Sequence, residues 1–144
     1  MERRKYLDRE AIDLAEWLLQ MGRHDGRLPI PVDGLVRCLG ARVFPVALPK
    51  IVRGVCDRER RIILVNRGLG KPAQRFVIAH ELSELLILDM GLPHGGWQNQ
   101  FAGHLLVPLR LLIREASGRG LDDLAEMFEV GEAVIAYQLR YGLE

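Results

Sequence analysis

The feature that most constrains this chain is a helix-forming segment, Pro72–Leu88, whose apolar residues cover nearly its whole circumference. On a helical wheel of roughly 100° per residue, only a narrow polar arc interrupts them. His80 marks one edge of that arc, Glu84 lies about 40° from it, and Glu81 lies about 100° from it. A helix that is apolar almost all round is buried, so we expect one imidazole and two carboxylates in or beside the core.

Three interpretations compete for this polar arc. Burying a charge is costly unless it is paired or binds a metal, so the arc could be a structural cluster in which His80 bonds a backbone carbonyl and the acids meet arginines. It could instead be a metal site, because His80 and Glu84 project from the same helix face and can converge on one ion. The third interpretation is general-base chemistry by Glu81 without a metal. The spacing favours the metal, since Glu81 would then reach a metal-bound water, as in the His-Glu-x-x-His zincin motif.

The composition is that of one soluble globular domain. Of the 144 residues, 49% are hydrophobic and 27% are charged, and the net charge is +1, whereas a nucleic-acid-binding domain usually carries a clear basic excess. Cys38 and Cys56 lack the paired spacing of a disulfide scaffold or a zinc module. The first residues are charged, and no apolar run of about 18 residues exists, so neither a secretory signal nor a membrane span is predicted. We expect a cytoplasmic protein with a single domain, residues 1–144.

The order of the expected elements predicts an α+β fold. Helices are expected at Asp8–Met21, with Asp8 as the N-cap, and at Pro31–Leu39. Short β-branched runs then predict a small, mostly antiparallel sheet of about three strands, with Asp57–Arg60 closing a hairpin. The expected strands are Ala41–Leu48, Ile51–Cys56 and Arg61–Val65, and the expected later helices are Pro72–Leu88, Trp97–Leu106 with a further turn or two to Ala116, Leu121–Phe128 and Glu132–Tyr141.

Several segments, in order along the chain, resemble the ImmA/IrrE family of metallo-endopeptidases. Residues 75–82 read Arg-Phe-Val-Ile-Ala-His-Glu-Leu, similar to the family's active-site helix, Arg-Phe-x-x-Ala-His-Glu-x-x-His. Residues 97–108 are similar to a second family signature, Asn-x-Phe-Ala-x-x-Leu-Leu-x-Pro. Residues 31–33 and 62–66 are also similar, and the C-terminal helical pair matches the helices that often close this domain. The resemblance therefore covers nearly the whole chain.

This resemblance implies a compact zincin-like domain in a bacterial or phage protein connected with transcriptional regulation. The characterised members of the family cleave a helix-turn-helix repressor. Carried onto this chain, zinc would be held by His80 and Glu84, and Glu81 would be the general base. Glu84 stands where the family has a second histidine, which gives a variant His-Glu-x-x-Glu motif; a carboxylate also ligates zinc.

The third ligand departs from the family pattern. The family has a glutamate a few residues before the Asn of its second signature, and that register falls on Gly95. We expect His94, on the adjoining Gly/Pro loop, to complete the metal shell. Asn99, His104 or water are the alternatives: Asn99 lies on the expected helix face but is a poor zinc ligand, and His104 lies on roughly the opposite face. His24 lies in an early polar loop and is expected to be exposed.

Two functions follow from these predictions. The first is a metal-dependent endopeptidase that cleaves a small regulatory protein such as a helix-turn-helix repressor. The alternative is a catalytically inactive family member, with an incomplete metal site, that regulates by binding a protein. The C-terminal pair itself has the outline of a helix-turn-helix, but Leu121–Glu132 carries five acidic residues and no Lys or Arg, the wrong sign for phosphate contacts. We therefore interpret the pair as core packing and expect no direct nucleic-acid binding.

Overall fold

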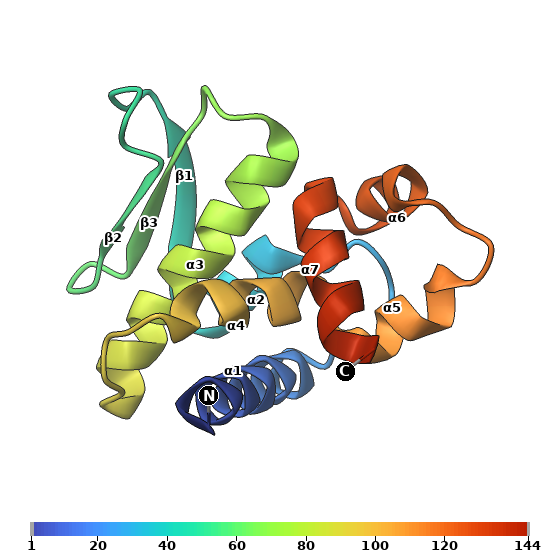
Figure 1. Cartoon of the computed structure of the whole chain (residues 1–144). Helices are drawn as coiled ribbons and strands as arrows, with labels where there is room; N and C mark the ends of the chain where they lie inside the picture. Colours follow the sequence, from blue (N-terminus) through green and yellow to red (C-terminus); the bar gives the residue numbers. More distant parts are fainter. Residues whose placement is uncertain (1, 144) are drawn as a thin grey trace.

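The computed structural model describes residues 2–143, which form two helices, a three-stranded sheet and then five helices in chain order (Figure 1). This order confirms the predicted α+β fold. The elements are α1 (Glu2–Met21), α2 (Val32–Cys38), β1 (Arg42–Val46), β2 (Gly54–Asp57), β3 (Ile62–Asn66), α3 (Lys71–Met90), α4 (Trp97–Leu106), α5 (Leu109–Ala116), α6 (Leu121–Phe128) and α7 (Glu132–Leu143).

The sheet is mixed, with the strand order β1-β3-β2. β2 and β3 form the predicted antiparallel hairpin, and in its turn the Asp57 carboxylate accepts a hydrogen bond from the backbone N–H of Arg60 (3.1 Å). β1 pairs in parallel with the other edge of β3, where the sequence predicts mostly antiparallel pairing. The hairpin follows from a local turn, but the β1 pairing depends on the path of the longer connection before β2, which no strand residue encodes.

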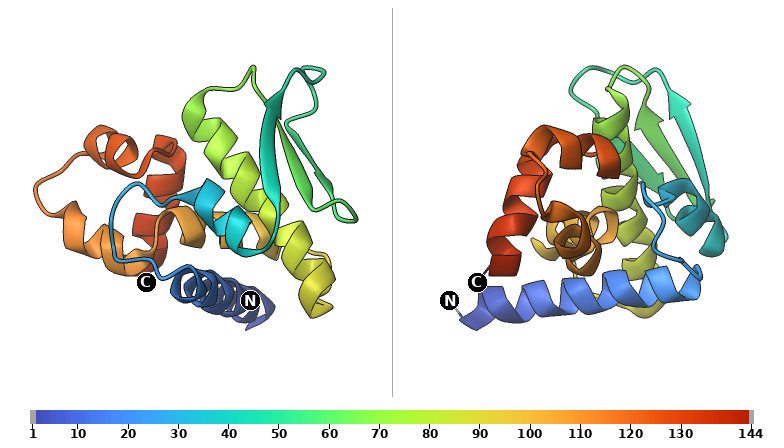
Figure 2. Two further views of the ribbon diagram at one scale, coloured as in Figure 1. Left: turned by 180° about the vertical axis from the view of Figure 1, so that it is seen from behind. Right: turned by 90° about the vertical axis from the view of Figure 1, so that its right-hand side faces the viewer.

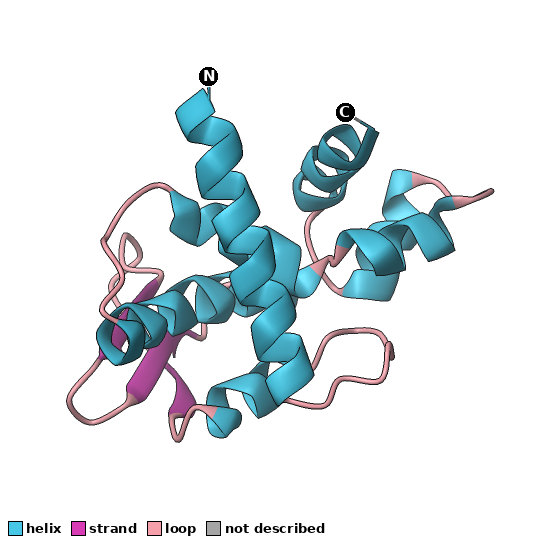
Figure 3. Cartoon of the chain, turned by 90° about the horizontal axis from the view of Figure 1, so that it is seen from below, coloured by secondary structure: helices cyan, strands magenta, loops and turns pink. Residues whose placement is uncertain are grey.

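Helix α3 lies at the centre of the fold. It packs against β2 and β3 on one side and against α4 on another, and α4 packs in turn on α1 (Figures 1 and 3). The prediction that this helix is buried is confirmed, since its apolar residues Val77, Ile78, Ala79, Leu82, Leu85, Leu86 and Ile87 are all buried. Although α3 is strongly apolar, no helix in the described part of the chain is long and apolar enough to cross a membrane.

The last three helices lie on the side of α4 away from the sheet (Figure 2). α6 packs on α7, and α7 contacts both α4 and α5. Leu124, Phe128 and Ile135 of this pair are buried, so the C-terminal helices contribute to the core as expected. The buried Arg75 guanidinium joins this group to α3, because it donates to the backbone carbonyls of Ile30 (2.8 Å) and Glu129 (3.1 Å).

The helix ends differ from the expected ones mainly at α1. The prediction that Asp8 caps this helix is wrong, because α1 already begins at Glu2 and Asp8 lies inside it. Residues 2–5 are Glu, Arg, Arg and Lys, which favour helix. α3 extends two residues beyond the predicted Leu88, to Met90, and ends where Gly91 adopts the left-handed conformation (φ 65°), as is common after a helix C-terminus.

Candidate functional site

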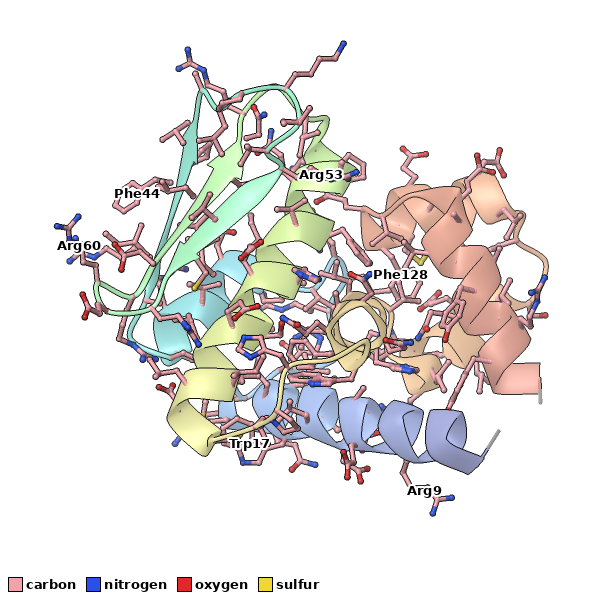
Figure 4. The ribbon with its side chains drawn as sticks, turned by 60° about the vertical axis from the view of Figure 1, so that its left-hand side comes forward. Arg9, Trp17, Phe44, Arg53, Arg60 and Phe128 are labelled. Carbon is pink, nitrogen blue, oxygen red and sulfur yellow. The ribbon has the colours of Figure 1, made fainter. Side chains whose placement is uncertain are left out.

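A cleft opens between the start of β2 and the neighbouring helices α3 and α4. Its volume is about 470 Å³, and its walls are formed by Ile51, Arg53, Gly54, Phe76, Val77, His80, Glu81 and Asn99. Figure 4 shows Arg53 beside the N-terminal half of α3, whereas Phe44 points away from α3 on the far side of the sheet. Two of the predicted site residues, His80 and Glu81, therefore lie in the wall of a cleft on the helix-covered face of the sheet.

Gly54 allows β2 to approach α3 closely at this cleft. A Cβ atom at this position would lie 2.5 Å from Val77 Cγ1 and 3.3 Å from Glu81 Cγ. The first distance is too short for two carbon atoms in contact. A side chain at position 54 would therefore push the strand away from the helix and widen the cleft beside Glu81.

His80 is oriented by a residue of α4. Its Nδ1 lies 2.8 Å from Oδ1 of Asn99. An amide oxygen can only accept a hydrogen bond, so the imidazole donates from Nδ1, and in the neutral ring Nε2 carries the lone pair. The hydroxyl of Ser83 donates to the backbone carbonyl of His80. Asn99 thus fixes the tautomer and the orientation of the ring, as hydrogen-bonded neighbours do for catalytic and metal-binding histidines.

Glu81 lies half-buried in the cleft wall. Burial raises the pKa of its carboxyl group; the charge of His80 opposes this shift and that of Glu84 adds to it. Cys56 of β2 is near both acids, and burial together with the two carboxylates raises the pKa of its thiol to about 12. Cys56 is therefore a neutral thiol at physiological pH and not a nucleophile, whereas Glu81 has the raised pKa that is typical of a general base.

Glu84 belongs to a second set of polar contacts, the α3–α4 cluster, which consists of Ser83, Glu84, His94 and Gln98. Its Oε1 accepts from Gln98 Nε2 (2.9 Å), and its Oε2 lies 3.1 Å from His94 Nε2. The same Gln98 nitrogen donates to the Ser83 hydroxyl (2.7 Å). Burial alone would raise the pKa of Glu84, but the hydrogen bonds from Gln98 and His94 lower it below its ordinary value. Both carboxylate oxygens of Glu84 are therefore engaged within the protein.

The predicted metal ligands are brought together only in part. Glu84 and His94 are in contact, whereas His80 bonds Asn99 instead of either of them. Within residues 2–143, no three His, Cys, Asp or Glu side chains are grouped so that they could hold a metal ion. A catalytic zinc site takes three protein ligands, so the donors in this arrangement do not fit the zinc that the family resemblance implies.

The two remaining histidines lie away from the cleft. His104 is on the far side of α4 from Asn99, as the helical wheel predicts, and is only 3% exposed. It lines a separate cavity, and His24 lines the same cavity. The expectation that His24 is exposed is wrong: it is half-buried, because the loop that follows α1 folds back toward α5.

Sequence reasoning missed Gly54 and Gln98. Gly54 carries no side chain and its close approach to α3 depends on the sheet, so no local pattern marks it. Gln98 lies within the second family signature region, one residue before Asn99. Its proximity to Glu84 would follow only from knowing how α4 packs on α3.

Known proteins resemble this chain in both sequence and fold. Residues 36–92 match the sequence model of a peptidase family described as IrrE N-terminal-like domain. The resemblance to the ImmA/IrrE family is confirmed. The IrrE-like segment contains the sheet and α3, and therefore His80, Glu81 and Glu84. It ends at Leu92, before His94 and α4.

The fold resembles that of a solved structure of a Mycobacterium tuberculosis transcriptional regulator. The TM-score is 0.69 at 24% sequence identity, and the similarity covers 90% of this chain and 46% of that one. This likeness shows the fold. The present chain spans less than half the length of the regulator. A comparison with curated protein sequences finds no match.

Proposed function

We propose that the cleft receives an extended segment of a regulatory protein and that this chain acts as a protein-binding member of its family. The observation that carries the proposal is the free edge of β2, which ends the described sheet and borders the cleft at Gly54. An extended peptide can add to such an edge through main-chain hydrogen bonds, while pockets beside it select side chains. Ile51, in the turn before β2 and in the wall of the same cleft, is 93% exposed, and a bound segment would cover it.

The use of the polar side chains favours binding over hydrolysis. Asn99 engages His80, and Gln98 and His94 engage Glu84. The contacts of Glu84 with Gln98 and His94 would have to rearrange before Nε2 of His80, Glu84 and His94 could share one metal ion. In this proposal the contacts stabilise the walls of a recognition cleft. The family resemblance implies a helix-turn-helix repressor as the class of partner.

Peptide hydrolysis is the second candidate, and one observation favours it. Glu81 lies in the cleft with a pKa raised by burial, and a general base works best when its pKa lies close to the operating pH. Glu81 would then be the general base, with zinc as the cofactor that the resemblance implies. Replacing Glu81 by Gln keeps the shape of the side chain and removes its basicity, so it separates the two candidates.

The proposal is tested by selecting a random peptide library, displayed on phage, against the full chain. We expect enriched peptides whose affinity falls about tenfold or more on Ile51→Asp, because an apolar contact is replaced by a charge. Ile113→Asp is the matched control, since Ile113 is 68% exposed on α5, outside the cleft wall. Enrichment of no peptide, or equal binding to the Ile51 variant, would contradict the proposal.

The same peptides distinguish binding from hydrolysis. Each is incubated with the zinc-supplemented wild-type chain and analysed by mass spectrometry. We expect intact peptides, and undiminished binding by Glu81→Gln. Cleavage by the wild type that is abolished in Glu81→Gln would replace the binding proposal with the second candidate.

A further inference from the structure

A second cavity, the α1–α5 pocket, lies between α1, the loop that follows it and the start of α5. Its volume is about 220 Å³. Its apolar wall is formed by Ile12, Leu19, Pro108 and Leu109, and its polar wall includes His24, His104 and Arg110. The volume is far more than the roughly 30 Å³ that one water molecule occupies in the liquid, and it is below the range of about 300–1,000 Å³ typical of pockets for drug-sized ligands. The space therefore suits a small molecule with an apolar part.

The hydrogen-bonding state of His104 follows from its buried neighbour Gln138. The side-chain nitrogen Nε2 of Gln138 lies 3.0 Å from His104 Nδ1 and 2.9 Å from the carbonyl oxygen of Val107. A carbonyl can only accept, so this atom is the amide nitrogen and Nδ1 of His104 accepts from it. Burial lowers the pKa of His104 to about 4, so the ring is neutral at physiological pH and carries its single proton on Nε2.

That Nε2–H group is a donor without an acceptor. His104 is 97% buried, and its Nε2 atom has no hydrogen-bond partner among the residues the structure describes. The same holds for Nε2 of His24 across the same pocket. A buried donor left unpaired costs free energy, so the Nε2–H of His104, with a second unpartnered ring nitrogen from His24 in the same pocket, points to a molecule that supplies an acceptor. A metal ion is excluded at His104, because its Nε2 holds a proton instead of a free lone pair.

The surrounding charges indicate what kind of acceptor this is. The pocket includes the N-terminus of α5, whose first turn has no side-chain cap and no acidic residue. The first N–H groups of a helix have no intrahelical partner and favour an anion. Arg110 lies in the wall. Asp25 is the strongest charge acting on His24, followed by Arg110, Arg27 and Arg114, and Asp25 is itself paired with Arg27 (2.9 Å). Glu16 is the one acid among the lining residues described, and it is exposed, so water screens its charge.

We propose that the α1–α5 pocket binds a small organic carboxylate. Its carboxylate oxygens would accept from His104 Nε2–H and from the first N–H groups of α5, beside the Arg110 guanidinium. Its apolar part would pack on Ile12 and Leu19. The pocket lies on the opposite side of α4 from the cleft, and none of its residues belongs to the cleft wall. The proposal therefore stands independently of the function assigned to the cleft.

The test uses the full ¹⁵N-labelled chain, titrated with acetate, pyruvate and benzoate while NMR spectra are recorded. At least one of these should produce saturable shifts of the His104 ring signal and of the backbone amides of Leu109 and Arg110. Benzyl alcohol, which has the ring of benzoate without its charge, should not. An absence of saturable shifts with all three carboxylates, or an equal response to benzyl alcohol, would overturn the proposal.

Two variants locate the site. His104→Phe keeps a ring but removes the donor, and Arg110→Gln removes an exposed charge without touching the core. Each should weaken the binding of the carboxylate about tenfold. Arg67→Gln, the same change at an exposed position far from the pocket, should leave it unchanged. If His104→Phe fails to fold, Arg110→Gln and its control still test the location of the site. A carboxylate affinity in the Arg110 variant equal to that of the wild type would contradict a site in this pocket.

Discussion

Two groups of polar side chains flank α4, and they differ in how completely they are hydrogen-bonded. In the α3–α4 cluster, both oxygens of Glu84 accept hydrogen bonds, and the Gln98 amide nitrogen donates twice. In the α1–α5 pocket, Nε2 of His104 and Nε2 of His24 have no partner in the described part of the chain. A saturated cluster rigidifies the interface between two helices, whereas an unsaturated one is ready to receive a ligand. Glu84 and His94, two of the residues expected to bind a metal, are thus engaged with each other, and His104, which the sequence offers only as an alternative ligand, lines the α1–α5 pocket.

The largest predicted effect is the pH dependence that His104 gives to stability. The folded-state pKa of about 4 is below the ordinary value of 6.5, so the neutral ring stabilises the folded protein above pH 6.5, and this contribution is lost as the pH falls toward 4. The gap in pKa corresponds to about 3 kcal/mol. Urea unfolding of wild type and His104→Phe across this pH range measures the contribution of His104 to the free energy of unfolding. The difference between the two proteins isolates His104, because His24, Glu81 and the other titrating groups are common to both. Parallel pH profiles would show that His104 titrates as it does in an unfolded chain.

The next effect tests whether the α3–α4 cluster is structural. Gln98→Leu keeps the size of the side chain but deprives the buried Ser83 hydroxyl and the Glu84 carboxylate of a donor. We expect the free energy of unfolding to fall by about 2 kcal/mol. Gln100→Leu is the matched control on the same helix, since the Oε1 atom of Gln100 is buried without a partner among the described residues; its stability should change little. Equal losses in the two variants would contradict a structural role for the cluster.

Much of the fold could be predicted from the sequence, because its signals are local. α4 and α6 have the predicted boundaries, since Gly and Pro residues bracket their apolar patterns. The hairpin between β2 and β3 also follows from its turn. The parallel pairing of β1 and the early start of α1 could not be predicted, because the first depends on a distant connection and the second occurs in a charged segment without a hydrophobic period.

The candidate site could be predicted only along α3. His80, Glu81 and Glu84 share that helix, so their spacing already brings them near the polar arc. Their partners come from α4 and from the loop before it, and whether Asn99 meets His80 depends on how the two helices pack. His24 and His104 line one pocket for the same reason, because the loop after α1 and helix α4 are far apart in the sequence and meet only in the folded chain.

The smallest predicted effect concerns zinc, and it bears most directly on the comparison. Of the three predicted ligands, only Glu84 and His94 are in contact. His94→Ala should therefore remove any zinc affinity, whereas His80→Ala should leave the affinity within about threefold of wild type. A true ligand or its orienting partner typically contributes 10-fold or more. Elemental analysis and a competitive zinc titration of the three proteins measure this difference. One equivalent of zinc that is lost in His80→Ala would mean that Nε2 of His80 joins Glu84 and His94 on one ion. The α3–α4 cluster would then be the closed state of a metal site, and Glu81 would stand beside the metal as the base of a peptidase. An affinity independent of His80 would support the binding proposal, in which the Asn99 contact orients the ring in the wall of the cleft.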